Sequence, residues 1–494
     1  MRPQTTGASL PSTSACVRTL RAYPVTRLRC RTNHAVAAGR DKDARLESLR
    51  DWLLSNGSPT SSFDDCGLVL CLGDDDDGYG VRALATKHIA ADDVIVSIPR
   101  LFFLSGLEAN NCDVCGRFKH DLSSFQLLLL KLLYENHIGE ASFWSPYLCT
   151  LPSIEMFTES HPLFWKADYL PANMSNAGGK LHERIKSCEN DVETFRNLGI
   201  GQAVVDDKYW PSLQQIKWAT AVLTSRAFHV GHASDYSDSD YDRDEQILST
   251  LSDIDDDVWE VGSFVDDNLE CAGHDIALVP WADGLNHSSS ATQRSILTYD
   301  GDTESAVLRA HIDYEAGDQV FDSYGLNLTC TDMLINYGFV EVAQRSTTLF
   351  FEFRGDAFLN IAIKVVEELN SSFSIVQLPG INAAETILRV DQSVGLGEQA
   401  LCFCESFFED VPENEDGTQA ALLALEVILR MCDDELLSID ENVVLSSERV
   451  IKDVKDGTVL MNERAAAYVI VNEYKALRAA KRAVMKQIAD IKST

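Results

Sequence analysis

The stretch from residue 277 to residue 341 constrains the fold most, because strand-like runs end there in short polar clusters. The apolar run 276–281 leads into D-G-L-N-H at 283–287, and the alternating run 319–323 leads into Y-G-L-N at 324–327. Asp, Asn and Gly suit the end of a buried strand, since they bond their own backbone or adopt positive φ. Functional groups gather where strands give way to loops, so both clusters are candidate site segments.

A third cluster, N-Y-G-F-V-E, follows at 336–341. In this order the clusters resemble the D-x-x-N-H, Y-x-x-N and Y-G-F segments of the SET-domain methyltransferases, in the branch of the Rubisco large-subunit lysine methyltransferase and the actin-histidine methyltransferase. The matching residues are Asp283, Asn286, His287, Tyr324, Asn327, Tyr337, Gly338 and Phe339. In that branch the first two segments meet through a pseudoknot. The resemblance therefore implies that they hold S-adenosylmethionine beside a narrow acceptor channel.

The chemistry of methyl transfer indicates what such a site needs. The reaction is an in-line displacement, so the nucleophile must lie close to the methyl group and opposite the leaving sulfur. A protonated amine cannot attack, and a narrow apolar channel lowers the pKa of a lysine that enters it. The resemblance implies that Tyr324 is the central catalytic tyrosine and that Tyr337 is a second catalytic residue, the aromatic wall of the channel. It places Gly78, Gly80, Val81, Arg82, Asn286, His287, Tyr324 and Phe339 at the cofactor, and Arg226, Asp283 and Tyr337 at the substrate.

Several of these assignments have a structural alternative. Gly78 and Gly80 let a backbone approach a ligand, but a G-x-G is also a common hairpin turn. His287 is either a general base or a histidine held by hydrogen bonds beneath the cofactor, and the second interpretation is favoured. Asp283 either contacts a ligand or bonds backbone N–H groups of its own turn. Arg226, in an S-R-x-F element of the family, either lies near the acceptor cleft or forms a buried pair with a carboxylate.

The pattern of the remaining chain predicts an α+β fold. Apolar runs predict strands at 68–72 and 94–99, and helical periodicity predicts helices at 45–54, 125–134 and 217–229. Three more helices are expected at 357–369, 418–432 and 462–491. The resemblance implies a β-rich SET fold with a pseudoknot and a helical insert, followed by an all-α C-terminal domain. That last domain either helps to bind the protein substrate, as in the family, or is an interaction bundle without such a role. The expected domains are 1–44, a disordered transit-peptide-like segment; 45–344, the SET domain with an insert at about 120–275; and 345–494, the helical substrate-binding domain.

The first 40 residues contain seven arginines among Ser, Thr, Ala and Pro, but no Asp or Glu. This composition is typical of an organelle transit peptide, with a disordered tail that carries no address as the alternative. The Ser, Thr and Pro content favours a plastid over a mitochondrion or the cytoplasm.

The formal net charge of −34 excludes sequence-independent binding to nucleic acid, which requires Lys and Arg to neutralise phosphates. It is compatible with a basic protein substrate. Fifteen acidic residues lie between 233 and 275 with Arg243 as the only base, which predicts a solvated loop. No apolar run has the length of a membrane helix, so we expect a soluble monomer with no membrane partner.

The thirteen cysteines are scattered and follow no secretory signal, which favours reduced thiols in an intracellular compartment. Cys112 and Cys115 form a C-x-x-C, which can supply two zinc ligands. No second pair lies at a suitable spacing, so incidental loop cysteines are favoured and no metal is expected.

The function expected from these features is S-adenosylmethionine-dependent methylation of a lysine on a protein substrate, with Rubisco large subunit and fructose-bisphosphate aldolase as candidates. The alternatives are methylation of a protein histidine, and a catalytically silent SET fold that only binds a partner. No phosphate-binding loop, nucleophile elbow or H-E-x-x-H pair competes with this interpretation.

Overall fold

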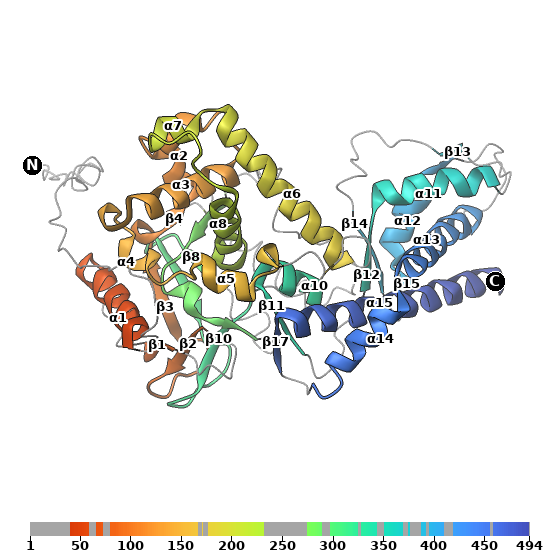
Figure 1. Cartoon of the computed structure of the whole chain (residues 1–494). Helices are drawn as coiled ribbons and strands as arrows, with labels where there is room; N and C mark the ends of the chain where they lie inside the picture. The colour runs from red at the N-terminus through yellow and green to blue at the C-terminus, as the bar shows by residue number, and fades with distance from the viewer. Residues whose placement is uncertain are drawn as a thin grey trace, which may run out of the picture.

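The computed structural model describes fourteen parts of the chain. They are residues 40–58, 66–72, 80–165, 170, 176–231, 274–288, 297–324, 328–342, 350–368, 374–375, 387–391, 395–409, 418–454 and 458–493. The transit-peptide-like segment up to residue 39, Gly78 and Asn327 lie outside them, as do residues 233–273 of the acidic loop predicted at 233–275. The last two residues of that predicted loop, His274 and Asp275, instead begin a strand. Figure 1 shows a larger sheet-containing part followed by a smaller part that is mostly helical.

One sheet of the larger part joins the two polar clusters. It consists of β1 (Leu68–Leu72), β2 (Val81–Ala85), β10 (Gln319–Asp322) and β7 (Asn286–His287), in that order. The pairs of β2 with β1 and β10 are antiparallel, whereas β10 and β7 run parallel with Phe321 opposite Asn286 and Asp322 opposite His287. The ends of the two clusters therefore lie side by side, as the sequence predicted.

Two further three-stranded sheets complete the β-structure of this part. One contains β3 (Val94–Pro99), β9 (Ser305–Arg309) and β8 (Thr298–Asp300). The other contains β4 (Leu104–Ser105), β6 (His274–Leu278) and β5 (Ala227–Gly231). The strands predicted at 68–72 and 94–99 are confirmed as β1 and β3.

Helices surround these sheets, with α1 beside β1 and the helices of the insert on another side (Figure 1). They are α1 (Arg40–Ser55), α2 (Gly106–Asn111), α3 (Ser124–Ile138), α4 (Ser145–Leu148), α5 (Ile154–Ser160), α6 (Asn176–Asn197), α7 (Ile200–Val204) and α8 (Leu213–Arg226). Short 3-10 turns lie between them at η5 (Arg100–Phe102), η6 (Cys115–Phe118), η7 (Gly139–Ala141), η8 (Pro162–Phe164) and η9 (Ala282–Gly284). Capping boxes start α3 at Ser123 and α8 at Ser212, each with Gln three residues later.

The end of α8 differs from the prediction. The helix expected at 217–229 stops at Arg226, and Ala227 begins β5, which pairs antiparallel with β6. Hydrogen bonds to β6 compensate for the end of the helix, a partner that helical periodicity does not reveal. Arg226 is therefore the last residue of the helix and directly precedes the strand.

The smaller part contains the three predicted helices as α11 (Gly355–Glu368), α13 (Thr418–Ser438) and α15 (Asn462–Ser493), with α12 (Glu398–Glu405) and α14 (Glu441–Val450) in addition. It also contains small sheets that the sequence did not predict: β12 (Phe350–Arg354), β14 (Ile387–Asp391) and β15 (Gly395–Leu396) form one, and β13 (Ser374–Ile375) and β16 (Phe408–Glu409) another. Between the two parts lie α10 (Cys330–Asp332), a π-helix η10 (Met333–Tyr337) and β11 (Phe339–Glu341), which pairs with β17 (Val459–Met461).

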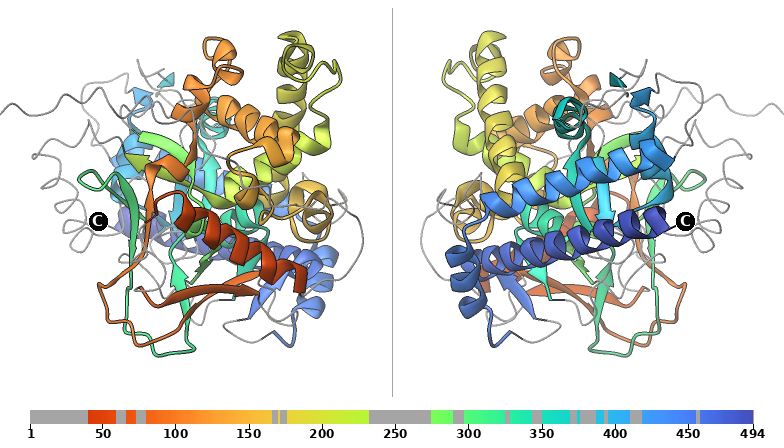
Figure 2. Two further views of the ribbon diagram at one scale, coloured as in Figure 1. Left: turned by 90° about the vertical axis from the view of Figure 1, so that its left-hand side faces the viewer. Right: turned by 90° about the vertical axis from the view of Figure 1, so that its right-hand side faces the viewer.

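The described residues form two hydrophobic cores, and α15 belongs to both. Ala465 and Val469 near its start are buried in the first core, whereas Leu477 and Val484 further along are buried in the second. Along this second half α15 lies beside α13, as Figure 2 shows on its right. None of the helices in the described part of the chain combines the length and the apolar character that a membrane span needs.

Candidate active site

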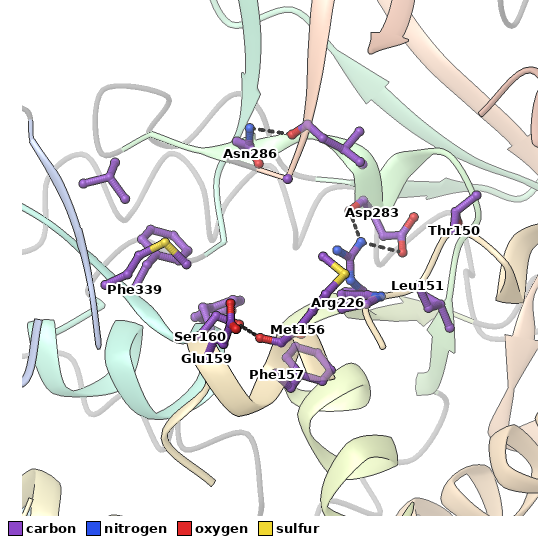
Figure 3. Close-up of a pocket in the computed structure, with 18 of the residues that line it drawn as sticks. Thr150, Leu151, Met156, Phe157, Glu159, Ser160, Arg226, Asp283, Asn286 and Phe339 are labelled. Atoms are coloured by element: carbon purple, nitrogen blue, oxygen red, sulfur yellow. Dashed lines mark hydrogen bonds and ion pairs between the residues drawn. The ribbon is translucent and has the colours of Figure 1, made fainter. Parts of the chain in front are cut away.

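A cavity of about 550 Å³ opens where the two polar clusters meet. Figure 3 shows Asn286 and Asp283 along one side, Met156 and Phe157 of α5 opposite, and Phe339 at one end. The sequence predicted the following lining residues: Gly80, Val81, Arg226, Asp283, Asn286, Tyr324, Tyr337 and Phe339. The structure therefore brings together segments that are more than 250 residues apart, from Gly80 to Phe339.

Aromatic side chains form one end of the cavity. The rings of Tyr324 and Tyr337 stack with centroids 4.6 Å apart and 23° between planes, and Phe339 lies edge-on to both at 6.4 and 6.3 Å. The Tyr324 hydroxyl donates to the carbonyl of Leu285 at 2.9 Å, and that of Tyr337 donates to the carbonyl of Tyr324 at 3.3 Å. The ring positions are thus fixed by hydrogen bonds as well as by stacking.

The backbone around Tyr337 explains how its ring reaches Tyr324. Tyr337 ends the π-helix, and Gly338 follows with φ = 81° before β11 begins. A Cβ at Gly338 would lie 2.8 Å from the carbonyl oxygen of Ser160, so only glycine fits this reversal. The π-helix and the glycine together place Tyr337 and Phe339 on the same cavity wall.

Asn286 and His287 fasten the two polar clusters to each other. The Asn286 side chain donates to the carbonyl of Val81 at 2.9 Å, which ties β7 to the first residue of β2. The backbone N–H of Tyr324 donates to Nδ1 of His287 at 3.1 Å. Burial lowers the pKa of His287 to about 4, so the ring is neutral at physiological pH and Nδ1 is free of a proton.

Arg226 and Asp283 form an ion pair in the wall. Arg226 Nη1 donates to the Asp283 carbonyl at 2.9 Å and to its carboxylate at 3.2 Å, and the hydroxyl of the fully buried Tyr147 donates to the same carboxylate at 2.8 Å. The Asp283 side chain is only 5% exposed and that of Arg226 is 23% exposed. Burial raises the pKa of Asp283, an effect that Arg226 and Tyr147 oppose. Both interpretations of Arg226 therefore apply, since it is paired with a carboxylate and also faces the cavity.

The phenols in and behind the cavity wall stay un-ionised at neutral pH. Burial is the main cause that raises the pKa of Tyr324, and it also raises the pKa values of Tyr337 and Tyr147. Their hydroxyls therefore act as hydrogen-bond donors and acceptors, not as phenolate bases.

Two of the predicted cofactor residues do not line the cavity. His287 lies behind Tyr324, with ring centroids 5.2 Å apart, and Arg82 follows Val81 on β2 without joining the lining. Gly78 and Asn327 fall outside the described residues.

Several cavity residues were not predicted. They come from α5 and its flanks (Leu151, Met156, Phe157, Glu159, Ser160) and from the strand near the C-terminus (Val459, Met461, Asn462). The sequence signal for the first group is the run Y-L-C-T-L-P at 147–152, which resembles the Y-L-x-x-L-P at the start of the helical insert in the SET branch named above. Val459 and Met461 reach the site because β17 pairs with β11, with Met461 opposite Phe339, a long-range pairing without a sequence signature.

Cys149, another lining residue, is disulfide-bonded. The expectation that the thiols stay reduced is therefore wrong at this position. The expectation agrees with the free thiols of Cys112, Cys115, Cys188, Cys330, Cys402, Cys404 and Cys432.

These features define the class of protein. The chain has the α+β architecture of a SET fold, as the sequence predicted. Its short sheets bring Asn286 and His287 beside β10, the strand that precedes Tyr324, and a helical insert and a helical C-terminal part complete it. The chain is similar over 91% of its length to the structure of Rubisco LSMT bound to AdoMet, with a TM-score of 0.61, 16% identity and 93% of that chain covered. This comparison confirms the fold.

Relatives in sequence agree with this result. A SET domain-containing protein 4 of Artemia parthenogenetica is 25% identical over 306 residues, which is 62% of this chain and 64% of that protein. The chloroplastic Rubisco large-subunit N-methyltransferase of Pisum sativum is 22% identical over 277 residues, covering 53% of this chain and 46% of the enzyme. The match thus spans less than two-thirds of these relatives. No protein-family model matches the chain. The resemblance to SET-domain proteins of the Rubisco methyltransferase type is confirmed.

Proposed function

We propose that the chain is an S-adenosylmethionine-dependent protein-lysine N-methyltransferase. The observation that carries the proposal is the stack of Tyr324 and Tyr337 at the edge of a cavity that Asn286 also lines. A methyltransferase of this kind needs a donor site and an aromatic acceptor channel in contact with each other. The similarity to Rubisco LSMT, solved with AdoMet, supports this assignment.

The cavity residues fit the cofactor. At Gly80, which lines the cavity, no atom lies within 4 Å of the place a Cβ would take, so the backbone there leaves room for a ligand. Val81 and Asn286 supply backbone and amide groups for the polar end of the ligand, and Phe339 offers an aromatic face for a purine. When bound, S-adenosylmethionine supplies a methyl group on a sulfonium leaving group.

The acceptor end is suited to an amine. The channel beside Tyr324 and Tyr337 disfavours an ammonium ion by burial, so a lysine loses its proton to solvent as it enters. Asp283, a carboxylate in this wall, is already paired with Arg226 and does not hold the amine in its charged form. We propose that the Tyr324 hydroxyl, together with the Leu285 carbonyl that it contacts, orients the neutral nitrogen.

His287 is assigned a positioning role. Its Nδ1 accepts the backbone N–H of Tyr324, which fixes the start of the segment that carries the catalytic tyrosine. Its ring is outside the cavity lining, so it has no path to the acceptor amine. These observations favour the held histidine over the general base.

Calorimetry combined with turnover tests the proposal. The full chain is titrated with S-adenosylmethionine, then incubated with labelled cofactor and an organelle extract, and the modified residue is located by mass spectrometry. Binding with label on lysine supports the proposal. Binding without turnover on any extract supports the silent module instead, and label on histidine supports the alternative acceptor. Absence of binding overturns both methyltransferase assignments and leaves the silent module.

The finer assignments rest on the relatives. We propose a plastid location, with residues 1–44 as the targeting segment, because the Pisum sativum relative is chloroplastic and the first 40 residues are basic and lack acids. The first substrates to test are then the Rubisco large subunit and aldolase. Fusion of residues 1–44 to a fluorescent protein checks the location, and fluorescence confined to the cytoplasm would contradict it.

A further inference from the structure

A pair of cysteines lies apart from the cavity in the turn between α2 and α3. Cys112 caps the C-terminus of α2, and Cys115 starts the 3-10 turn η6. The N–H of Gly116 donates to the carbonyl of Cys112 at 2.9 Å, so the chain makes one helical turn and both side chains point the same way. Cys115 is fully buried, whereas Cys112 is partly exposed.

The surroundings of Cys112 stabilise a thiolate. The Cys115 thiol and the backbone N–H groups of Cys115 and Val114 all hydrogen-bond its sulfur, and the ammonium of Lys131 lies nearby. Together these groups lower the pKa of Cys112 to about 5, although burial opposes them. The same hydrogen bond and burial raise the pKa of Cys115, which keeps its proton.

The charge beside the pair is built into α3. The Lys131 side chain is 7% exposed, donates to Glu135 at 2.7 Å and lies 4.9 Å from the centroid of the Trp144 ring. Ser142 donates to the other Glu135 oxygen at 2.6 Å, so this carboxylate is fully engaged. The ionisable groups that act on the two sulfurs are Lys131, which favours a thiolate, and Glu135, which opposes one at Cys115.

The turn also has the compactness that a ring between the two sulfurs needs. A Cβ at Gly116 would lie 2.3 Å from the carbonyl oxygen of Asn110, so the turn packs directly under α2. In the part of the chain that the structure describes, no group of three or more His, Cys, Asp or Glu is arranged to hold a metal. A dithiol without further ligands is better suited to thiol–disulfide exchange than to zinc.

We propose that Cys112 and Cys115 form a reversible dithiol–disulfide site, with Cys112 as the attacking thiolate and Cys115 as the resolving thiol. The oxidant is a disulfide of a small thiol, such as oxidised glutathione. The Cys112 sulfur attacks it to give a mixed disulfide and one released thiolate. Cys115 then loses its proton and displaces the second thiol, which leaves the protein disulfide. Two electrons pass to the oxidant, and two small thiols are the products.

Equilibration of the full chain in glutathione buffers, followed by acid quench, alkylation and peptide mapping, tests the site. Wild-type protein is expected to gain a disulfide between Cys112 and Cys115, and peptide mapping separates it from the disulfide of Cys149. Cys115→Ser is expected to stop at the mixed disulfide, with one glutathione on residue 112. Cys112→Ser is expected to form neither, and Cys402→Ser, which removes an exposed thiol on α12, is expected to behave as wild type.

Reactivity supplies a second measurement that does not depend on oxidation. At pH 6, iodoacetamide is expected to alkylate Cys112 of the folded, reduced wild-type chain, followed by peptide mapping, about tenfold faster than the same residue in urea. The reason is that the larger thiolate fraction outweighs its lower nucleophilicity. Circular dichroism verifies that the variants fold. Glutathione that fails to attach at residue 112 of Cys115→Ser, or equal alkylation rates in the folded and unfolded chains, would overturn the proposal. Neither readout requires methyltransferase activity.

Discussion

At the scale of single residues, the cavity depends on groups held in their neutral forms. Asp322 and His287 are paired in register between β10 and β7, and both are buried. Burial raises the pKa of Asp322 to about 8 and lowers that of His287 to about 4, so neither is charged at pH 7. The strand pair that carries the candidate site is thus uncharged at its centre, which avoids the cost of burying isolated ions.

Tyr324→Phe is expected to lower the turnover number about 100-fold, since it removes a single positioned hydroxyl. The ring, and so the stack on Tyr337, is retained. The measurement is the methylation rate at saturating cofactor, with circular dichroism to verify the fold. Tyr299→Phe, a buried tyrosine on β8 outside the cavity, is the control and should keep its rate. A full rate in Tyr324→Phe would remove this residue from the mechanism.

Asp322→Asn is expected to change how stability depends on pH. The pKa of Asp322 in the folded protein, about 8, lies above the value in the unfolded chain. The contribution of protonated Asp322 to the free energy of unfolding is therefore fully present only below about pH 4, and it is lost as the pH rises towards 8. Between pH 5 and pH 8 the wild type should therefore lose about 4 kcal/mol relative to Asp322→Asn.

Urea unfolding at several pH values measures this difference. Asp300→Asn is the control: hydrogen bonding by Thr303 lowers the pKa of Asp300, so this carboxylate is ionised throughout the range and the wild-type slope should persist. Parallel stability curves for wild type and Asp322→Asn would show that Asp322 ionises in the folded state as readily as in the unfolded chain.

At the scale of elements, the π-helix and β11 carry the aromatic wall, and Gly338 is the joint between them. Gly338→Ala should destabilise the protein by about 1–2 kcal/mol from the left-handed backbone alone, and further because the new methyl group meets Ser160. Gly317→Ala is a matched control, with φ = 98° and nothing within 4 Å of the added carbon. Thermal unfolding and methylation rate are compared. Only Gly338→Ala should lose activity. Equal effects in both variants would contradict the role of Gly338 in positioning the aromatic wall.

The elements also show what the sequence can predict. The strand at 68–72 and the position of Tyr324 directly after β10 follow from local patterns of apolar residues and turn formers, which the chain carries in short windows. The end of α8 and the role of Met461 depend on partners far away in the chain, β6 and β11. Tyr147 is not among the predicted site residues, because its bond to Asp283 crosses 136 residues. Local patterns do not encode such pairings.

At the scale of the whole molecule, the two parts share a helix. The predicted domain boundary near residue 344 remains a prediction, and the first core includes residues well beyond it, among them Leu460, Ala465 and Val469. A chain that ends at residue 344 loses these side chains and exposes the apolar surface they cover. The structure thus favours a single folding unit over two independent ones.

We expect the 1–344 chain to be insoluble or to lack a cooperative melting transition. In the full chain, Val469→Ala should lower the free energy of unfolding by about 2 kcal/mol, because it leaves a cavity in the first core. Differential scanning calorimetry measures both. Leu437→Ala, at a side chain that is 84% exposed on α13, is the control and should change little. A soluble 1–344 chain that melts cooperatively would contradict the shared core.

The continuous α15 has a consequence for how far apart docking and chemistry take place. This helix is anchored in both cores, so it holds the C-terminal helices at a fixed distance from the wall formed by Val459 and Met461. If the proposed function holds, a protein seated on those helices presents its acceptor lysine at a set reach from the docking face. The enzyme would then select its lysine by distance from the docking face. A lysine at the matching distance would be methylated, whereas lysines closer to that face or farther from it would not.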